Sequence, residues 1–488
     1  MSNLNQGSTR LFLAVMIAYT FLISGCGGGN SVTSGGTTPP PTAAWTWMGG
    51  SNATAAVGVY GTQGTPSTSN VPGARGSSVG WTDSSGNVWL FGGSGLDSTG
   101  GGDGGPLNDL WKFSPTSKEW TWISGSNIAN DLGRYGTQGV FASTNSPGAR
   151  ENAVSWTDKS GNFWLFGGSG IGPTVPGSNT VTSGDLNDLW EFNPTTSQWA
   201  LISGSNIINM PGVYGTQGVA SPGNTPSARS GAYGWTDSSG NLWLFGGGGL
   251  DEIWEFNISV KEWAWIAGSQ SVYVAPVYGT QGVASATSTP GTRPEAVGVG
   301  DKNGNFWLYG GTANYGSCND DFSDLWEFNT STKEWTWVNG SNCGQVGPVY
   351  GTQGIASASN TPGGRENAVG WIDASGNFWL FSGFDNFDQA PVTSGVSFEQ
   401  GYFSDLWEFD MSSKQWNWMG GSDLFNQNGA YGTLGTPSAS NIPGARGSSG
   451  LPLALTDSNG DLWLFGGYGL GASGRSNGLL NDLWRYQL

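Results

Sequence analysis

The sequence predicts an all-β fold, a six-bladed propeller in which each blade is one copy of a four-stranded repeat. The stretch Val71–Trp122 recurs in six copies along the 488 residues. Each copy contains four short runs of β-forming residues separated by turn residues. The 85 glycines and 27 tryptophans suit tight turns and large aromatic side chains between sheets. Because one unit cannot bury its apolar face alone, the copies are expected to form a single domain.

The four expected strands are clearest in the first copy, where they read SSVGWT, NVWLFGG, NDLWKFS and EWTWIS. The first two are joined by Asp-Ser-Ser-Gly-Asn, a tight turn in which glycine supplies the positive φ and aspartate bonds its own backbone. The D-x-x-G-N spacing supplies too few oxygen ligands for calcium. We therefore expect the six turn aspartates to be structural: Asp83, Asp158, Asp237, Asp301, Asp373 and Asp457.

This pattern resembles the kelch repeat, with Arg at the start, Gly-Gly after the second strand, an aromatic residue in the third and Trp in the fourth. The resemblance covers about nine-tenths of the chain. It implies a kelch-type β-propeller similar to the central domain of galactose oxidase. The copper site of that enzyme needs histidines and a crosslinked Cys–Tyr pair, and this chain has no histidine. We therefore expect neither that activity nor a metal or other cofactor.

The last copy ends after its third strand, at Leu488. Near the other end of the chain, Trp45-Thr46-Trp47 matches the missing fourth strand, and Trp47 precedes Arg75 by the 28 residues found in the other copies. We expect this N-terminal strand to complete the last blade and close the ring. The predicted propeller domain therefore spans residues 45–488.

Residues 1–26 are typical of an export signal. Arg10 is followed by an apolar stretch, Leu11–Ile23, that is too short to span a bilayer. The segment Leu22–Cys26 (LISGC) resembles a bacterial lipobox, which implies a lipid-anchored protein modified at Cys26; the alternative is an ordinary cleavable signal. By the same resemblance, Gly27 in place of Asp implies the outer membrane in a Gram-negative host. Residues 27–44 are rich in Gly, Ser and Pro and predict a tether.

Charge and composition exclude several classes of function. The formal net charge of −18 argues against nucleic acid as a partner, because phosphates need a basic surface. The lack of histidine excludes Ser-His-Asp triads and histidine-ligated zinc or copper.

The connection between the second and third strands varies from 2 to 19 residues among the copies, and variable loops carry recognition. We expect ligand contacts on the face where these loops emerge. In some kelch proteins, residues at the position of the repeated arginine contact acidic ligands; the alternative is that each arginine bonds a nearby carboxylate or carbonyl. Candidate ligand-binding residues are the arginines Arg75, Arg150, Arg229, Arg293, Arg365 and Arg446, and the loop aromatics Tyr315, Phe384, Phe387, Phe398 and Tyr402.

A disulfide is expected between Cys318 and Cys343. Both lie in connections that leave the fourth blade on the same face, and exported proteins retain such bonds.

These observations predict a binding or interaction module for an extracellular glycan or protein, with no catalytic residue assigned. One alternative is a sugar-processing enzyme, similar to a mutarotase or epimerase, that acts on an acidic sugar and moves a proton with Glu151 or Glu366. Another is a purely structural cell-surface protein. An enzyme predicts an axial pocket with a glutamate of shifted pKa, whereas a binding module predicts exposed loop aromatics.

Overall fold

The computed structural model describes residues 43–100, 104–176, 180–315, 318–344, 346–386, 401–448, 450–474 and 476–488. The chain divides into two units, Met1–Pro40 and Pro41–Leu488, and all described residues belong to the second. The predicted signal peptide, Cys26 and most of the predicted tether lie outside the described residues. The described part of the chain contains strands and no helix, and therefore no helix that could span a membrane.

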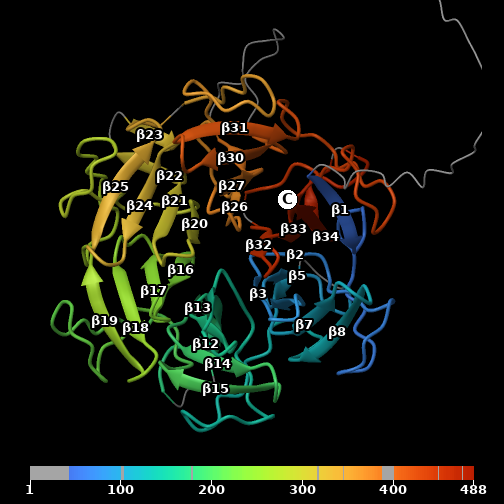
Figure 1. The fold of residues 1–488 in the computed structure, drawn as a ribbon. Coiled ribbons are helices and arrows are strands. Elements are labelled where there is room, and N and C mark those ends of the chain that lie inside the picture. The colour runs from blue at the N-terminus through green and yellow to red at the C-terminus, as the bar shows by residue number, and fades with distance from the viewer. Residues whose placement is uncertain are drawn as a thin grey trace, which may run out of the picture. The chain divides into compact units, whose positions relative to one another are not determined.

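Six four-stranded antiparallel sheets make up the body of this unit and follow one another in chain order (Figure 1). Each is an up-and-down sheet, which confirms the prediction of an all-β, propeller-type architecture. The first strand of each sheet lies nearest the centre of the unit in Figure 1 and contacts the first strands of the neighbouring sheets. These first strands are β3 (Val79–Thr82), β10 (Val154–Thr157), β16 (Ala232–Thr236), β20 (Val297–Gly300), β26 (Val369–Ile372) and β32 (Leu453–Thr456).

The second and third strands carry the Trp-Leu-Phe and Asp-Leu-Trp motifs. The second strands are β4 (Val88–Phe91), β11 (Phe163–Phe166), β17 (Leu242–Gly246), β21 (Phe306–Tyr309), β27 (Phe378–Phe381) and β33 (Leu462–Gly469). The third strands are β7 (Leu110–Ser114), β14 (Leu189–Asn193), β18 (Ile253–Asn257), β24 (Leu325–Asn329), β30 (Leu406–Asp410) and β34 (Gly478–Gln487).

Five of the fourth strands follow their third strand directly in the chain, and the remaining one comes from the N-terminus. The five are β8 (Glu119–Ser124), β15 (Gln198–Ser203), β19 (Glu262–Ala267), β25 (Glu334–Asn339) and β31 (Gln415–Gly420). The sixth is β1 (Ala44–Gly49), which pairs antiparallel with β34 so that Trp47 lies opposite Trp484. The two ends of the described chain thus belong to one sheet, β1-β34-β33-β32.

Short hairpins occupy most of the connections between second and third strands, as β5 (Ser94–Gly95) with β6 (Gly105–Pro106), β12 (Ser169–Pro173) with β13 (Val181–Asp185), β22 (Thr312–Tyr315) with β23 (Cys318–Asp321), and β28 (Phe384–Asp385) with β29 (Gly401–Tyr402). The first two hairpins also pair with the segments that carry the repeated arginine, β2 (Arg75–Gly76) and β9 (Arg150–Glu151).

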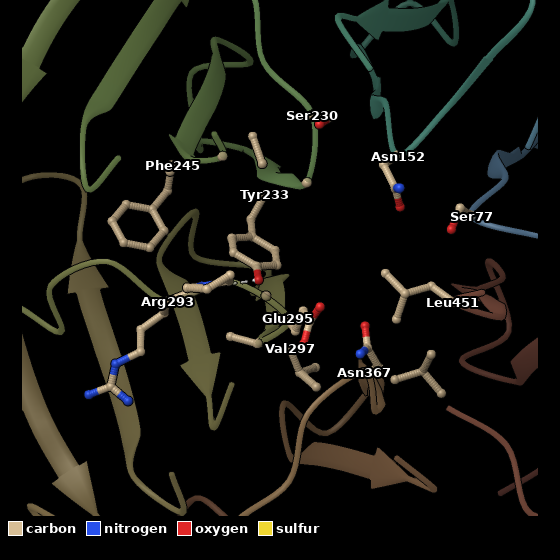
Figure 2. A pocket seen from close by; sticks show the side chains of 18 of the residues that line it. Ser77, Asn152, Ser230, Tyr233, Phe245, Arg293, Glu295, Val297, Asn367 and Leu451 are labelled. Atoms are coloured by element: carbon tan, nitrogen blue, oxygen red, sulfur yellow. Dashed lines mark hydrogen bonds between the residues drawn. The ribbon is translucent and has the colours of Figure 1, made fainter. Parts of the chain in front are cut away.

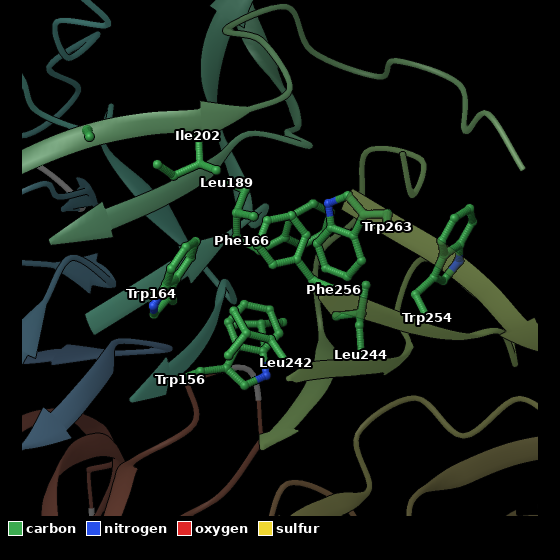
Figure 3. Packing of buried hydrophobic residues seen from close by; sticks show 12 residues of the cluster. Trp156, Trp164, Phe166, Leu189, Ile202, Leu242, Leu244, Trp254, Phe256 and Trp263 are labelled. Carbon is green, nitrogen blue, oxygen red and sulfur yellow. The ribbon is translucent and has the colours of Figure 1, made fainter. Parts of the chain in front are cut away.

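The hydrophobic core lies between neighbouring sheets. One cluster joins the second and third sheets through Phe166, Leu189, Trp254, Phe256 and Trp263, all at most 1% exposed (Figure 3). Comparable clusters join every other neighbouring pair, including the sixth sheet with the first. The repeated tryptophans are therefore core residues, as their regular spacing predicts.

Candidate functional site

The six arginines proposed as ligand contacts are buried, and each is paired with the acidic residue of the third strand. The side chain of Arg75 is fully buried, and its Nη1 lies 2.6 Å from Oδ1 of Asp109. Its Nη2 donates to the other carboxylate oxygen at 2.8 Å, while Nη1 and Nε also donate to the carbonyls of Gly92 and Gly73. The equivalent pairs are Arg150–Asp188, Arg229–Glu252, Arg293–Asp324, Arg365–Asp405 and Arg446–Asp482.

Each of these carboxylates also accepts hydrogen bonds from two repeated aromatic residues. Asp109 accepts from the hydroxyl of Tyr60 at 2.6 Å and from the indole of Trp111 at 2.7 Å. Burial, followed by the Asp109 charge, raises the pKa of Tyr60 well above its usual range. Since most of its donors are bonded inside the protein, the arginine has little left to offer a ligand. These contacts favour the alternative of structural pairing, and ligand binding by the arginines stays a prediction.

The partner of the arginine differs from the one that the sequence suggested. Glu151, Glu295 and Glu366 follow three of the arginines closely, but the ion pairs join residues about 20 to 40 positions apart. This pairing ties the start of each first strand to the third strand of the same sheet. The turn aspartates are structural as expected: Asp83, for example, accepts from the backbone of Ser85 and from the indole of Trp89.

Of the predicted loop aromatics, the structure describes Tyr315, Phe384 and Tyr402, and Tyr402 is buried. Tyr402 is only 8% exposed and packs against Phe384, with ring centroids 5.0 Å apart, so little of its ring is accessible to a ligand. Tyr315 is half-buried, and its hydroxyl donates to the carbonyl of Thr292 at 2.8 Å. Phe387 and Phe398 lie outside the described residues.

Cys343 forms a disulfide. The side chain of Cys318 lies outside what the structure describes, so the pairing of Cys343 with Cys318 stays a prediction. The backbone of Cys318 is paired with that of Tyr315 in the β22–β23 hairpin.

A pocket of about 410 Å³ opens at the start of the first strands, where segments from all six copies meet (Figure 2). Its polar rim is formed by residues two positions after the repeated arginine. We call these residues the belt: Ser77, Asn152, Gly231, Glu295 and Asn367. All five have positive φ, between 52° and 66°. Because Ser77 adopts this conformation, the first strand begins at Val79 and not at Ser77 as the sequence suggested.

Backbone hydrogen bonds link the belt residues across neighbouring sheets. The N–H of Asn152 donates to the carbonyl of Ser77 at 3.0 Å, and the N–H of Gly231 donates to that of Asn152 at 3.0 Å. Asn367 donates to Glu295 at 2.8 Å, and Ser77 donates to Leu451 at 2.7 Å. These bonds fix the backbone conformation that places the side chains of Asn152, Glu295 and Asn367 at the opening (Figure 2).

The lining becomes apolar further along the first strands, where it is formed by Tyr233, Val297, Val369 and Leu453. Tyr233 stands where the other copies have a smaller aliphatic residue, and its hydroxyl donates to the backbone carbonyl of Arg293 at 3.0 Å. The pocket therefore combines hydrogen-bonding groups at its rim with an aliphatic and aromatic interior. Ligand pockets of about 300–1,000 Å³ in proteins commonly have this composition.

The rim of the pocket carries a carboxyl pair. Glu295 lines the pocket, and the side chain of Glu366, which is 9% exposed, hydrogen bonds to it. Burial, and then the proximity of Glu295, Asp321 and Asp385, raises the pKa of Glu366 to about 9. Glu366 is therefore protonated at neutral pH and can share its proton with Glu295. Among the described residues, no three acidic or cysteine side chains are arranged to hold a metal ion.

The pair can hold a hydrogen bond to a hydroxyl group or move a proton to or from a bound molecule. Glu151, the other candidate for proton transfer, lies outside the pocket lining, although burial raises its pKa as well. Sequence reasoning missed the belt. The available signal was that the residue two positions after each arginine varies among small and polar types while the arginine itself repeats.

A second cavity, of about 550 Å³, lies at the opposite ends of the first strands. Its rim includes Thr82, Thr236 and Thr456, whose hydroxyls bond to backbone carbonyls of neighbouring sheets. These hydroxyl groups hold the sheets together, so the belt pocket is the better candidate site.

No protein-family model matches this sequence, and a comparison with curated proteins finds no match. Among solved structures, that of YjhT aligns with a TM-score of 0.46 and 15% sequence identity, over 87% of this chain and 95% of YjhT. A match at this level does not establish a family or a function.

Proposed function

We propose that this chain is an exported, lipid-anchored, six-bladed kelch-type propeller that binds a neutral extracellular carbohydrate in the belt pocket. The alternative partner is an extracellular protein.

Three observations support six blades in a ring closed by the N-terminal strand. The described residues form six four-stranded sheets, and β1 supplies the outer strand of the last one. The first strands β3 and β32, which are the first and last in the chain, contact each other. The N–H of Ser77, in the first copy, donates to the carbonyl of Leu451, in the last. A ring that joins its last sheet to its first leaves few exposed strand edges.

Export and lipid anchoring rest on the sequence of residues 1–26 and on its lipobox-like segment ending at Cys26. The disulfide at Cys343 supports an oxidising compartment, because such bonds rarely persist in the cytosol.

The observation that carries the binding proposal is the composition of the belt pocket. Carbohydrates present hydroxyl groups at their edges and C–H groups on their ring faces. The belt offers amide, hydroxyl and carboxyl groups to the sugar hydroxyls. Tyr233, Val297 and Val369 offer apolar surface to the C–H faces of the rings.

A neutral sugar fits this pocket better than an acidic one. The arginines that would have held a sugar carboxylate are buried in ion pairs, with side-chain exposures of 0%. Arg293 lines the pocket but is paired with Asp324, which leaves the Glu295 side as the charged part of the rim. A carboxylate beside Glu295 would be repelled, and the net charge of −18 adds to that repulsion.

A glycan array of neutral and acidic oligosaccharides tests the proposal. The wild-type protein should bind neutral glycans, and the double variant Asn152→Gly/Asn367→Gly should bind them at least tenfold more weakly, a loss of about 1.4 kcal/mol. Glycine occupies this belt position naturally at Gly231, so the double variant should fold. Absence of glycan binding by the wild-type protein, or binding unchanged in the double variant, would contradict the proposal.

A second candidate function is favoured by the Glu295–Glu366 pair, namely a sugar-processing enzyme that moves a proton within the same pocket. Following the anomeric signals of neutral and acidic sugars by NMR tests this candidate. Faster interconversion with the wild-type protein, lost in Glu366→Gln while binding persists, would favour the enzyme. Binding without turnover would favour the binding module. If the protein shows neither binding nor turnover, the purely structural role is favoured.

A further inference from the structure

The third copy has the shortest connection between second and third strands, Gly248–Gly249. The N–H of Gly248 donates to the carbonyl of Ser230, and the N–H of Leu250 donates to the carbonyl of Gly247, both at 3.1 Å, so the chain reverses at once. Residues Gly247–Leu250 of this connection line the belt pocket, whereas the described residues of the other connections between second and third strands do not. The pocket therefore extends toward the third copy, where a hairpin like those of the other copies is missing.

An exposed tyrosine stands beside this turn. Tyr273 is 75% exposed, and its N–H donates to the carbonyl of Gly249 at 2.9 Å. A Cβ atom added to Gly249 would lie 3.6 Å from Cε1 of the tyrosine ring, so the ring rests against the turn that borders the pocket. The neighbouring Val272 is 54% exposed and adds apolar surface.

The backbone conformation of Tyr273 is unusual for its side chain. Its φ of 58° lies in the left-handed region, which is an outlier for a bulky residue and favours Asn, Asp or Gly. The position 20 residues before the next repeated arginine is also left-handed in other copies, where it is held by Ala55, Asn130, Asn209 and Asn426.

The asparagines at this position have a structural role that tyrosine cannot take over. Oδ1 of Asn209 accepts from the N–H of Asp185 at 3.0 Å, and Oδ1 of Asn426 accepts from the N–H of Tyr402 at 3.0 Å. Each of these bonds pins a hairpin between second and third strands. The third copy has no hairpin to pin, and it presents an aromatic ring to solvent at the same place. A costly conformation that holds an exposed ring at the edge of the pocket is the observation that motivates a role in binding.

We propose that Tyr273 is a stacking platform for one ring of a neutral oligosaccharide whose neighbouring ring occupies the belt pocket, entering over Gly248–Gly249. This inference rests on the proposed function and names its second subsite. An aromatic face contributes apolar contact area to the C–H face of a sugar at a low cost in conformational entropy. The belt and Glu295 supply the hydrogen bonds that an exposed ring alone cannot offer.

Tyr273→Asn tests the platform with a residue that the repeat itself uses at this position. The melting temperature should stay the same or rise, because asparagine tolerates positive φ better than tyrosine. The dissociation constant for neutral oligosaccharides of two to six units, measured by calorimetry, should increase about tenfold. Tyr273→Phe is the matched control and should keep wild-type affinity, since stacking uses the ring and not the hydroxyl.

The outcomes separate the two proposals. If the wild-type protein binds neutral oligosaccharides and Tyr273→Asn binds them equally well, the platform is overturned while the belt-pocket function stands. If the wild-type protein binds no carbohydrate, both proposals fail. Should Tyr273→Asn be destabilised, Tyr273→Ala repeats the measurement with the residue found at Ala55.

Discussion

The replacement of Arg75 by methionine and of Asp109 by leucine, singly and together, tests whether the repeated arginine stabilises the fold or binds a ligand. Both side chains are fully buried and joined by two hydrogen bonds of 2.6 and 2.8 Å. Removing one partner leaves the other as a buried, unpaired charge, which costs about 3–5 kcal/mol.

The two single variants should differ in how much they lower the free energy of unfolding. In Arg75→Met, the Asp109 carboxylate keeps hydrogen bonds from the Tyr60 hydroxyl and the Trp111 indole. In Asp109→Leu, the hydroxyl and the indole lose their acceptor, and each unsatisfied buried group adds about 1–3 kcal/mol. The guanidinium loses its carboxylate partner and keeps only the carbonyls of Gly73 and Gly92. Asp109→Leu should therefore be the more damaging single change. The double variant should lose clearly less than the sum of both, because no unpaired charge remains.

Thermal unfolding measures these differences. With an unfolding entropy of about 2.1 cal/mol/K per residue, a loss of 3–5 kcal/mol in the unit Pro41–Leu488 lowers the melting temperature by about 3–5 °C. Arg134→Met is the matched surface control. Arg134 lies 3.8 Å from Asp131 with a side chain that is 68% exposed, so this variant should change the free energy of unfolding by less than about 1 kcal/mol.

Ligand binding supplies the deciding second measurement. Below its melting temperature, Arg75→Met should bind glycans as the wild-type protein does, because Arg75 donates only to groups inside the protein. An unchanged melting temperature combined with lost binding would refute the structural role and restore the arginine ring as a ligand site.

Three further predictions follow from the ends of the chain, the cysteines and the carboxyl pair. Deleting residues 45–48 removes most of β1 from β34 and should lower the melting temperature and promote aggregation; unchanged melting would count against closure by this strand. Mass spectrometry of a non-reduced digest should find Cys318 linked to Cys343, whereas an alkylatable thiol at Cys318 would exclude that pairing. The pKa of Glu366 rises from 4.5 to about 9 on folding, so the folded state holds the proton more tightly. The stability that the neutral carboxyl contributes is complete below about pH 4.5 and is lost as the pH rises through about 9. In Glu366→Gln, the free energy of unfolding measured with urea should therefore decline less across this pH range. A decline identical to that of the wild-type protein would refute the raised pKa of Glu366.

The fold was largely predictable because each copy of the sequence repeat corresponds to one four-stranded sheet. Short runs of β-forming residues such as Val88–Phe91 mark a strand, and the equal spacing of six copies marks equivalent sheets. The match of Trp45-Thr46-Trp47 to a fourth strand correctly anticipated its pairing with the C-terminal strand. The exact start of the first strand was not predictable, because the positive φ of Ser77 depends on its hydrogen bond to Leu451 in another copy.

The site was less predictable, because ion pairing between distant residues decides which side chains remain available. The sequence places Glu151 next to Arg150, whereas folding brings Asp188 to it. From the sequence, a repeated arginine favours a structural pair over a ligand contact, but the sequence does not identify the partner. The same limit applies to Tyr402, which is polar enough for a loop surface but packs against Phe384.

Departures from the repeat can also be structural, as copy five illustrates. Glycine at the position of Gly92 is required because its φ is 61° and an added Cβ would lie 2.8 Å from the carbonyl oxygens of Leu107 and Arg150. Copy five has Ser382 there, also at positive φ. Its hydroxyl lies within hydrogen-bond distance of the carbonyls of Phe403 and Arg446 and can donate its one proton to either, which turns a steric conflict into a hydrogen bond. An exception of this kind is compensated within the scaffold.

The exceptions in the third and fourth copies gather at one place, the belt pocket. Gly248–Gly249 removes a hairpin, Tyr233 adds a ring to the pocket, Tyr273 exposes a ring at positive φ, and Glu295 places a carboxylate where other copies have a smaller residue. All four line the belt pocket or border its edge. Residues that maintain the fold must repeat with the blades, since every sheet packs against an equivalent neighbour. A ligand in a pocket lined by all six copies has no such symmetry, so the residues that recognise it are expected among the exceptions to the repeat, and these gather between the third and fourth copies.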